Sequence, residues 1–241
     1  MKYINARISD KVNQFYKTGE ITTSQFMDPS ELIEVAGAIR HVPHVTFGGY
    51  EDAERKIIFI GAEEDGVSDI FSEFISIIRI TSNEALSHRS VLGSVVGLGI
   101  KREMIGDILI NDKTCDIIVM NTIVEFLINN FKFVGREKIT LKQIGLEELQ
   151  MPQDTSREIK TTVKSLRLDA VISAGFGLSR EKSAELIKNE AVKLNFIVTK
   201  SSAKSVNADD VISVRGKGRL VVSEINGQTK SDRIKIVLLR K

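Results

Sequence analysis

The stretch RLDAVISAGFGLSREKSAELIKNEAVKLN, residues 167–195, carries the most specific pattern in the chain. Its glycine turn, Gly175-Phe176-Gly177, is followed by Ser179, whose hydroxyl can accept a hydrogen bond from the free N–H groups that begin a helix. Apolar residues then recur at helical spacing. This apolar face comprises Ala184, Leu186, Ile187 and Ala191. The spacing therefore predicts a helix that starts at Ser179 and leaves Arg180 and Lys182 pointing outward.

The end of this helix and the segments after it can also be predicted. Asn189 lies where a left-handed cap residue is wanted, a conformation that Asn tolerates, and Lys188 before it points outward. Residues 191–198 and 211–215 are rich in branched apolar side chains, so each is expected to form a strand. The stretch thus predicts one capped helix followed by two strands.

The order of these pieces resembles the RNA-binding domain first seen in small-subunit ribosomal protein S-four, the alpha-L motif. That pattern runs from R-L-D through S-R and L-I to V-x-V-N and G-D-x-I-x-V-R. The matching pieces are Arg167-Leu168-Asp169, Ser179-Arg180, Leu186-Ile187, Val192-Lys193-Leu194-Asn195 and Asp209-Asp210-Val211-Ile212-Ser213-Val214-Arg215. Two glycine-containing turns are replaced, by Asn189-Glu190 and Asp209-Asp210, and turns tolerate Asn and Asp. The resemblance implies RNA binding, with Arg167 at the start of a preceding helix.

Length and composition are those of an ordinary globular protein of two or three small domains. The 241 residues are 42% apolar and 27% charged. The single cysteine, Cys115, excludes a disulfide framework and fits a reducing compartment. The N-terminus lacks a signal-peptide layout, and no run approaches the ~18 apolar residues of a membrane span. We therefore expect a cytoplasmic protein with no membrane partner.

Charge is distributed unevenly along the chain. Residues 155–241 contain 18 Lys and Arg and 9 Asp and Glu, which gives a net charge of +9. Residues 1–154 have a net charge of −7. A basic segment indicates binding to the phosphate backbone of nucleic acid, although a basic surface that contacts only solvent is also common. Together with the motif, the charge predicts RNA binding by the C-terminal part.

The N-terminal region predicts mostly helix followed by a strand. Apolar side chains recur every three or four residues from Met1 to about Arg40. Within this region Asp28-Pro29-Ser30-Glu31 fits a helix start with Asp28 as the cap. Pro43 ends the helix, because a proline disfavours helix before it. Residues 47–55 are expected to form a turn and a helix onset, and residues 56–61 a strand.

The middle of the chain has the order β-α-β-β-α-β of a ferredoxin-like, RRM-like domain. The predicted elements are residues 75–80, 88–97, 107–110, 116–120, 122–130 and 138–144, with a hairpin turn at Asn111-Asp112-Lys113-Thr114. Ordinary RRMs stack bases on aromatic strand residues, and this region lacks that pattern. The fold class is therefore α+β and multidomain, with an RRM-like middle domain that has no aromatic stacking pattern.

Residues 149–156 are polar, aperiodic and contain Pro152, which makes them the best candidate for a linker. The chain is expected to end in a hairpin of residues 220–225 and 234–239, with Asn226-Gly227 in its turn. The predicted domains are an N-terminal α/β domain (1–72), an RRM-like domain (73–148), the linker (149–156) and an alpha-L domain (157–241).

Two internal motifs extend the resemblance to nearly the whole chain. They are FGGYEDAER at residues 47–55 and HRSVLGSVVGLGIKRE at residues 88–103, which Gly106-Asp107-Ile108 closely follows. With the alpha-L domain they resemble the YlmH family of bacterial RNA-binding proteins. The resemblance implies binding of rRNA and tRNA on large ribosomal subunits that carry obstructed peptidyl-tRNA, in ribosome-associated quality control. It implies no catalytic residue.

No segment carries a catalytic, metal or cofactor pattern that outweighs a structural explanation. The glycines of residues 93–99 are spaced in the reverse of a dinucleotide fingerprint and are expected to end a helix. His41 and His44 have no Cys or third His nearby, so zinc is not expected. Cys115 lies in an apolar stretch and is expected to be a packing residue. We therefore expect no enzyme activity, no cofactor, no metal and no small-molecule substrate.

The residues expected to contact RNA lie in the alpha-L domain and in one segment of the middle domain. The loop Gly216-Lys217-Gly218 lacks the spacing of a P-loop but suits contact with phosphate. Lys101 and Arg102 follow a run of small residues that allows either close packing or close approach of a phosphate, and these two side chains could also be simple surface charges. The full set is Arg167, Ser179, Arg180, Lys182, Lys188, Lys193, Arg215, Lys217, Arg219, Lys101 and Arg102.

Two other functions remain open from the sequence. Pseudouridine synthases and some methyltransferases carry an alpha-L domain, but they place it N-terminal to a larger catalytic domain, and residues 1–154 show no methyl-donor glycine loop. YlmH-like proteins tend to be encoded among cell-division genes, so a structural role in division is the third possibility. The sequence ranks an RNA-binding factor acting on the ribosome first.

Overall fold

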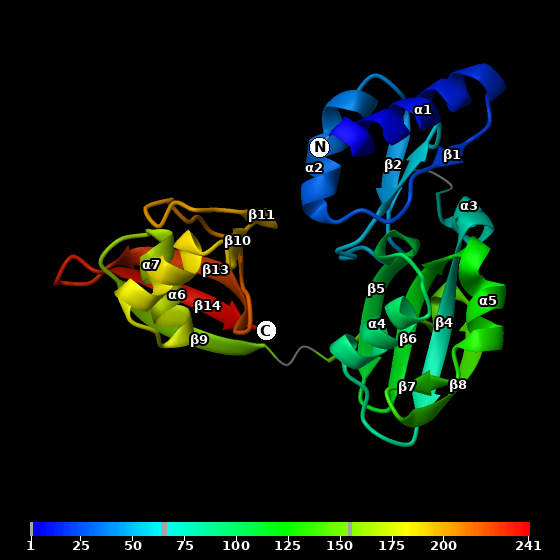
Figure 1. The fold of residues 1–241 in the computed structure, drawn as a ribbon. Helices are drawn as coiled ribbons and strands as arrows, with labels where there is room; N and C mark the ends of the chain where they lie inside the picture. Colours follow the sequence, from blue (N-terminus) through cyan, green and yellow to red (C-terminus); the bar gives the residue numbers. More distant parts are fainter. Residues whose placement is uncertain (1, 64–66, 154–155) are drawn as a thin grey trace. The chain divides into compact units, whose positions relative to one another are not determined.

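The computed structural model describes residues 2–63, 67–153 and 156–241. By its contacts the chain divides into two units, Met1–Gln153 and Asp154–Lys241, and each has its own sheets and apolar core (Figure 1). Helices and strands are mixed in both units. The predicted α+β fold class is confirmed.

The N-terminal part of the first unit packs helices on a small antiparallel sheet with the strand order β1-β3-β2. Ile8, Val35 and Ile58 lie in the apolar cluster that joins the two longer helices to this sheet. The elements of this part are α1 (Lys2–Thr18), β1 (Thr22–Thr23), α2 (Pro29–Ile39), β2 (His44–Phe47), β3 (Ile57–Ile60) and α3 (Val67–Phe74).

Helix α2 begins where the sequence predicts. Asp28 Oδ1 accepts the N–H of Ser30 at 2.9 Å and that of Glu31 at 3.0 Å, while the Glu31 carboxylate accepts the Asp28 N–H at 2.7 Å. This capping box leaves Pro29 at the first helical position. The predicted helical region thus contains two helices, and Gly19, with φ +70, follows the first of them in a left-handed conformation.

The predicted helix onset within residues 47–55 is wrong. Phe47 ends strand β2, and the residues after it form turns and bends. Gly49 has φ +105, which no helix contains. The N–H groups of Glu54 and Arg55 donate to the Asp107 side chain, so these groups are unavailable to a helix. Strand β2 and helix α3 were not predicted from the sequence.

The middle part of the first unit has the predicted β-α-β-β-α-β order with one addition, because the short strand β7 (Phe133–Val134), which was not predicted, precedes the last strand. Its sheet order is β5-β6-β4-β8-β7, and all neighbouring strands are antiparallel. The strands and helices are β4 (Ile75–Ser82), α4 (His88–Gly97), β5 (Ile105–Asn111), β6 (Thr114–Met120), α5 (Val124–Asn130), β7 (Phe133–Val134) and β8 (Glu137–Ile144). Three short 3₁₀ turns complete it, η1 (Arg102–Met104), η2 (Asn121–Ile123) and η3 (Leu146–Glu148).

Both faces of this middle sheet are buried. Val91 of α4 and Leu127 of α5 share one apolar cluster with Ile78 of β4. On the opposite face, Phe26 and Phe59 of the N-terminal part pack in a second cluster. The strand residues of that second cluster are Ile75, Ile77, Ile118 and Ile144. The sheet is therefore a layer between the two helices and the N-terminal part.

The start of the predicted linker is attached to this sheet. Asp116 is buried, and its carboxylate accepts two hydrogen bonds of 2.7 Å from the Arg79 guanidinium. Asp116 Oδ2 also accepts the Gln150 N–H at 2.9 Å, and Asn111 Nδ2 donates to the Gln150 carbonyl. Residues 149–150 thus belong to the first unit, and residues 154–155 lie outside the described residues.

The second unit packs two helices on one face of a six-stranded antiparallel sheet with the order β11-β10-β12-β13-β14-β9 (Figure 1). Val171 and Ile187 of the helices meet Leu220 and Leu238 of the strands in one apolar cluster. The elements are β9 (Arg157–Val163), α6 (Leu168–Phe176), α7 (Arg180–Lys188), β10 (Val192–Leu194), β11 (Ile197–Val198), β12 (Val211–Val214), β13 (Gly218–Gln228) and β14 (Ile234–Arg240).

Three predicted details of the second unit are wrong. The left-handed residue after α7 is Glu190, with φ +57, and Asn189 stays at φ −83. Residues 191–198 are two strands, because Asn195 and Phe196 both have positive φ and reverse the chain. Asn226 pairs with Lys235 inside the last hairpin, so the turn lies at residues 229–233.

Candidate nucleic-acid interface

Helix α7 opens with the predicted cap. Ser179 has an extended backbone, and its Oγ accepts the Lys182 N–H at 3.1 Å. Within the described chain, no acceptor takes the N–H groups of Arg180 and Glu181. The first turn of a helix carries a partial positive charge, and free N–H groups there bind anions. The start of α7 therefore has the geometry of a phosphate site.

The start of α6 is different, because its N–H groups already have partners. Leu168 N–H donates to the Lys204 carbonyl at 2.9 Å, and Asp169 N–H donates to the Ser202 carbonyl at 3.2 Å. Arg167, the N-cap residue, forms an isolated bridge with Ser205. The loop of residues 199–210 thus closes the N-terminus of α6. Of the two helix starts, only that of α7 remains open to an anion.

Two of the predicted RNA-contacting arginines share one buried carboxylate. Asp169 accepts 3.2 Å hydrogen bonds from Arg167 Nε and Nη2, and a 2.7 Å hydrogen bond from Arg180 Nη2. The Asp169 side chain is 7% exposed, whereas those of Arg167 and Arg180 are 43% and 47% exposed. Asp169 therefore fixes two guanidinium groups that still reach solvent and hold unused N–H donors.

The protonation of Asp169 follows from these contacts. Burial by itself would raise the pKa of Asp169, and the hydrogen bonds from Arg167 and Arg180 outweigh it. The pKa of Asp169 consequently lies below its usual range, so the carboxylate is ionised at neutral pH. The three side chains carry a net charge of +1. Asp169 is the third residue of the R-L-D motif in the sequence. It was not predicted as part of the site, because patterns of RNA contact point only to basic residues.

The other basic residues of the set lie in different places. Lys193 of β10 alternates with the buried Val192 and Leu194, so it lies on the sheet face away from the helices. Arg219 faces the same way, because Lys193 pairs with Ser213 and Ser213 pairs with Arg219. The Arg219 guanidinium lies 5.4 Å from the centre of the Phe196 ring.

The structure thus divides the expected set into two groups on opposite faces of one sheet. The helix-side group is Arg167, Ser179, Arg180, Lys182 and Lys188. The strand-side group is Lys193 and Arg219, with Arg215 and Lys217 exposed in the turn between β12 and β13. One nucleic-acid helix bound to the helix side leaves the strand side uncovered.

Lys101 and Arg102 lie in the first unit. Lys101 is exposed before η1, as expected for a residue that could meet phosphate. Arg102 is half-buried, and its Nη1 donates to the backbone carbonyls of Ile105 and Gly106. Burial, aided by the nearby Arg55 charge, lowers the pKa of Arg102 to about 10. Arg102 therefore holds the chain at the start of β5, a role that the sequence did not indicate.

The two internal motifs meet at a junction between the N-terminal part and the middle sheet. Asp107 accepts the Tyr50 hydroxyl at 2.8 Å and the Glu54 N–H at 2.7 Å. Arg55 is buried and donates from its guanidinium to the carbonyls of Phe26 and Ile105. Burial and the hydrogen bond to Asp107 raise the pKa of Tyr50 well above its usual value. These residues hold the first unit together.

The junction also explains the missing aromatic pattern of the RRM-like sheet. Ordinary RRMs bind bases on the sheet face away from the helices. Here Phe26 and Phe59 of the N-terminal part cover that face. A Cβ on Gly106 would lie 2.7 Å from the Phe26 ring, so glycine at this position permits the close contact. The sheet face that stacks bases in ordinary RRMs is occupied by protein.

Two kinds of reactive site, an activated thiol and a metal cluster, can be checked in the described part of the chain. Burial raises the pKa of the Cys115 thiol to about 12, which makes it a poor nucleophile. Across residues 2–63, 67–153 and 156–241, no three His, Cys, Asp or Glu side chains gather as a metal site would require. The same ranges contain no helix with the length and apolar character of a membrane span.

Comparison with known proteins agrees with this arrangement. Three family models match, "YlmH, N-terminal" at residues 4–65, "Putative RNA-binding domain in YlmH" at residues 71–148, and "S4 domain" at residues 166–212. The Ribosome-associated protein quality control protein P2 of Bacillus subtilis is 32% identical over 223 residues, which cover 90% of this chain and 86% of that protein. The chain belongs to the YlmH family. Its resemblance to an RNA-binding family with an S4 domain is confirmed.

A solved structure shares the YlmH fold. The cell division protein ylmH of Streptococcus pneumoniae superposes on this chain with a TM-score of 0.52. The matched region covers 62% of this chain and 94% of the Streptococcus pneumoniae chain. The two sequences are 17% identical, so this likeness concerns the fold alone.

Proposed function

We propose that this YlmH-family chain is a non-catalytic RNA-binding factor that acts on the large ribosomal subunit, in the cytoplasm, during quality control of stalled translation. Its relative from Bacillus subtilis is named for ribosome-associated quality control. Its RNA would be the rRNA and tRNA of a ribosomal particle. The observation that carries the proposal is the pair of arginines held by Asp169 beside the open start of α7.

In this proposal the helix-side group provides the main RNA contact. The N–H groups at the start of α7 and the guanidinium groups of Arg167 and Arg180 would each bind a phosphate oxygen, with Lys182 as a further charge. Contacts to phosphate position the protein without reading sequence. The strand-side group and Lys101 would contact RNA at the edges of this site, and Arg102 would act through the backbone that it holds.

The proposed domain limits are 1–72, 73–148 and 157–241, joined by a linker over residues 149–156. They are supported by family matches at residues 4–65, 71–148 and 166–212 and by the change of unit after Gln153. The attachment of Gln150 to Asp116 favours a linker that begins later than residue 149.

Crosslinking of the full chain to RNA in cells, followed by sequencing of the bound RNA, tests the function. We expect crosslinks to large-subunit rRNA and to tRNA, and we expect the Arg167→Gln/Arg180→Gln variant to lose most of them. The Lys193→Gln/Arg219→Gln variant is the matched control, because it removes the same charge from the other sheet face. Crosslinks to messenger RNA alone, unchanged in both variants, contradict the proposal.

A further inference from the structure

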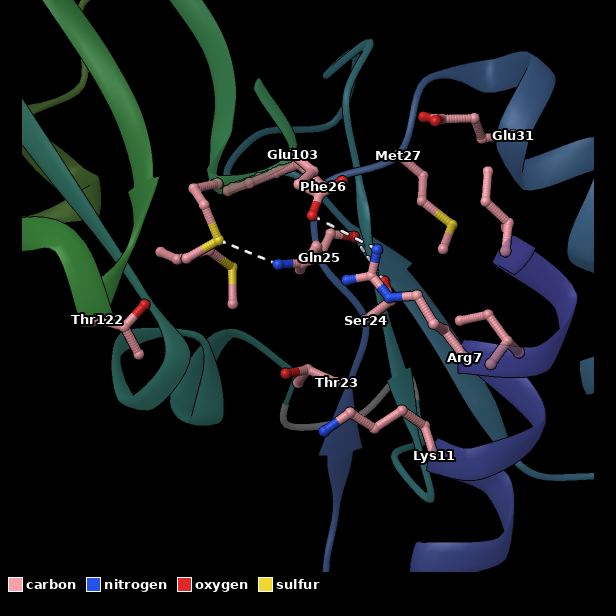
Figure 2. A pocket seen from close by; sticks show the side chains of 14 residues that line it. Arg7, Lys11, Thr23, Ser24, Gln25, Phe26, Met27, Glu31, Glu103 and Thr122 are labelled. Carbon is pink, nitrogen blue, oxygen red and sulfur yellow. Dashed lines mark hydrogen bonds and ion pairs between the residues drawn. The ribbon is translucent and has the colours of Figure 1, made fainter. Parts of the chain in front are cut away.

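The first unit contains a pocket that the RNA-binding function does not use. Its volume is about 400 Å³, and it lies between one face of α1, the segment of residues 23–27 and the ends of η1 and β6 (Figure 2). Pockets of this size between packed parts of a chain are typical small-ligand sites. The lining residues are Ile4, Arg7, Ile8, Lys11, Thr23, Ser24, Gln25, Phe26, Met27, Glu31, Glu103, Met104, Met120 and Thr122.

The apolar part of the lining suits a flat ring. Met27, Met104 and Met120 are three of the five methionines in the chain, and Phe26 lies with them. A thioether is polarizable and adapts its shape, and sulfur packs favourably against aromatic rings. This composition favours a planar aromatic group over a sugar or a flexible acyl chain.

Gln25 provides an amide that lacks good partners. Its Nε2 donates to the Met104 sulfur at 3.1 Å, and a thioether is a weak acceptor. Its Oε1 is buried and finds no donor in the described chain. A buried polar atom without a partner destabilises the folded state. A ligand that offers both a donor and an acceptor, as the edge of a nucleobase does, relieves this cost when the amide turns toward it.

The pocket is lined by two basic and two acidic side chains, and one of the basic ones has no ion pair within the described part of the chain. Arg7 and Lys11 extend from α1 toward the segment that carries Thr23 and Gln25 (Figure 2). Two carboxylates also line the pocket, but both have partners: Glu103 lies 3.4 Å from Arg7, and Glu31 accepts the Asp28 N–H. Among the described residues, Lys11 has no ion pair. Lys11 is therefore the cation that a bound phosphate would meet.

The geometry points to a nucleotide-binding pocket between α1 and the RRM-like sheet, with the base among the methionines, its edge on Gln25 and its phosphate on Lys11. This inference goes beyond the proposed function, which uses the second unit. The nucleotide comes either from solution or from an unpaired position of an RNA chain, because both present the same base and phosphate.

Methionine methyl NMR of the full chain tests this pocket, with each nucleoside 5′-monophosphate and an RNA tetranucleotide as the two sources. We expect the Met27, Met104 and Met120 signals to shift and saturate while Met151, which is outside the lining, stays constant. The pocket binds the source that saturates the methionine signal shifts at the lower concentration. Constant signals at millimolar concentrations of both, or equal shifts with inorganic phosphate alone, overturn the assignment.

Three variants separate binding from folding. Lys11→Ala is expected to weaken binding about tenfold, the effect of one charge-assisted contact. Lys17→Ala removes the same charge from an exposed position of α1 outside the pocket and should leave binding unchanged. Gln25→Leu should weaken binding and raise the melting temperature, because it removes the buried oxygen without a donor. Equal nucleotide affinities of wild type and Lys11→Ala overturn the assignment. RNA binding by the second unit is expected to be the same in all these variants, so this outcome leaves the proposed function standing.

Discussion

At the scale of single residues, the buried carboxylate of Asp169 decides how the candidate RNA site is built. It accepts hydrogen bonds from two arginines that are nearly half exposed. Each arginine alone would lose side-chain entropy when it met a phosphate. Because Asp169 already restricts both guanidinium groups, part of that loss occurs during folding. The site is therefore ordered before RNA arrives.

Replacing Asp169 by asparagine tests the anchor through its dependence on pH. The pKa of Asp169 is lower in the folded chain than in the unfolded one, so its charge stabilises the fold above the unfolded value. We expect Asp169→Asn to lower the free energy of unfolding by about 1–2 kcal/mol at pH 7. The effect is no larger because both arginines are partly exposed to solvent, which screens their charges. The difference should shrink as the pH falls below about 4. Urea titration followed by NMR signals of Leu168 and Val171 measures it, and a pH-independent difference contradicts this account.

At the scale of elements, helices and strands divide the basic residues between two faces. Helix α7 presents Arg180 and Lys182 at its open start. Strand alternation turns Lys193 and Arg219 to the opposite face. The packed sheet therefore separates two groups of equal charge that the sequence alone combines. We propose that the helix-side group makes the main RNA contact.

Salt dependence distinguishes these two faces. Arg180→Gln/Lys182→Gln should weaken binding to all structured RNAs about equally and lower the slope of log K against log salt by about two, one for each lost phosphate contact. Lys193→Gln/Arg219→Gln removes the same charge and should change the slope less. Filter binding across a salt series measures both. Equal losses in the two variants would show that RNA contacts both faces alike.

The junction between the two motifs of the first unit is expected to stabilise it. Asp107→Ala leaves the Tyr50 hydroxyl and two backbone N–H groups without their acceptor. We expect a loss of about 2–4 kcal/mol, since buried donors without acceptors are costly. Hydrogen exchange should speed up in residues 47–60 and 102–111. Asp52→Ala, at an exposed position of the same loop, is the control, and equal protection in both variants would contradict the role of Asp107.

Local chemistry made much of the fold and part of the site predictable. Asp28 and Ser179 each cap a helix by accepting N–H groups two or three residues further along the chain, so short sequence patterns predicted both caps. The errors arose where distant residues act. Residues 47–55 form no helix because Asp107 takes their N–H groups, and Asn226-Gly227 is no turn because β13 continues on β14. Lys193 and Arg180 lie on opposite faces of the sheet because of how the sheet and helices pack, and no local sequence pattern predicts that.

At the scale of the whole molecule, the excess of basic residues lies in the second unit, since residues 155–241 have a net charge of +9 and residues 1–154 one of −7. The RRM-like sheet is covered on both faces. The thiol of Cys115 is buried and protonated at neutral pH. We propose on this basis that the chain binds RNA without changing it.

Purified protein should therefore leave RNA chemically unaltered. We expect no modified nucleoside when structured RNA is incubated with the full chain, with or without a methyl donor, because the Cys115 thiol is protonated and the described residues form no metal cluster. Nucleoside analysis by mass spectrometry measures this. The appearance of pseudouridine or of a methylated base would assign the chain to the RNA-modifying enzymes.

We propose that the second unit binds RNA by itself. Residues 157–241 contain six strands, two helices and one apolar cluster of their own. We expect this fragment to fold alone and to bind structured RNA, with an affinity that falls as salt rises. The most direct test is titration of the folded fragment, checked by NMR, with an rRNA stem-loop at low salt. Saturable binding that Arg180→Gln/Lys182→Gln weakens is the predicted result, and a folded fragment with no affinity for RNA would contradict the claim.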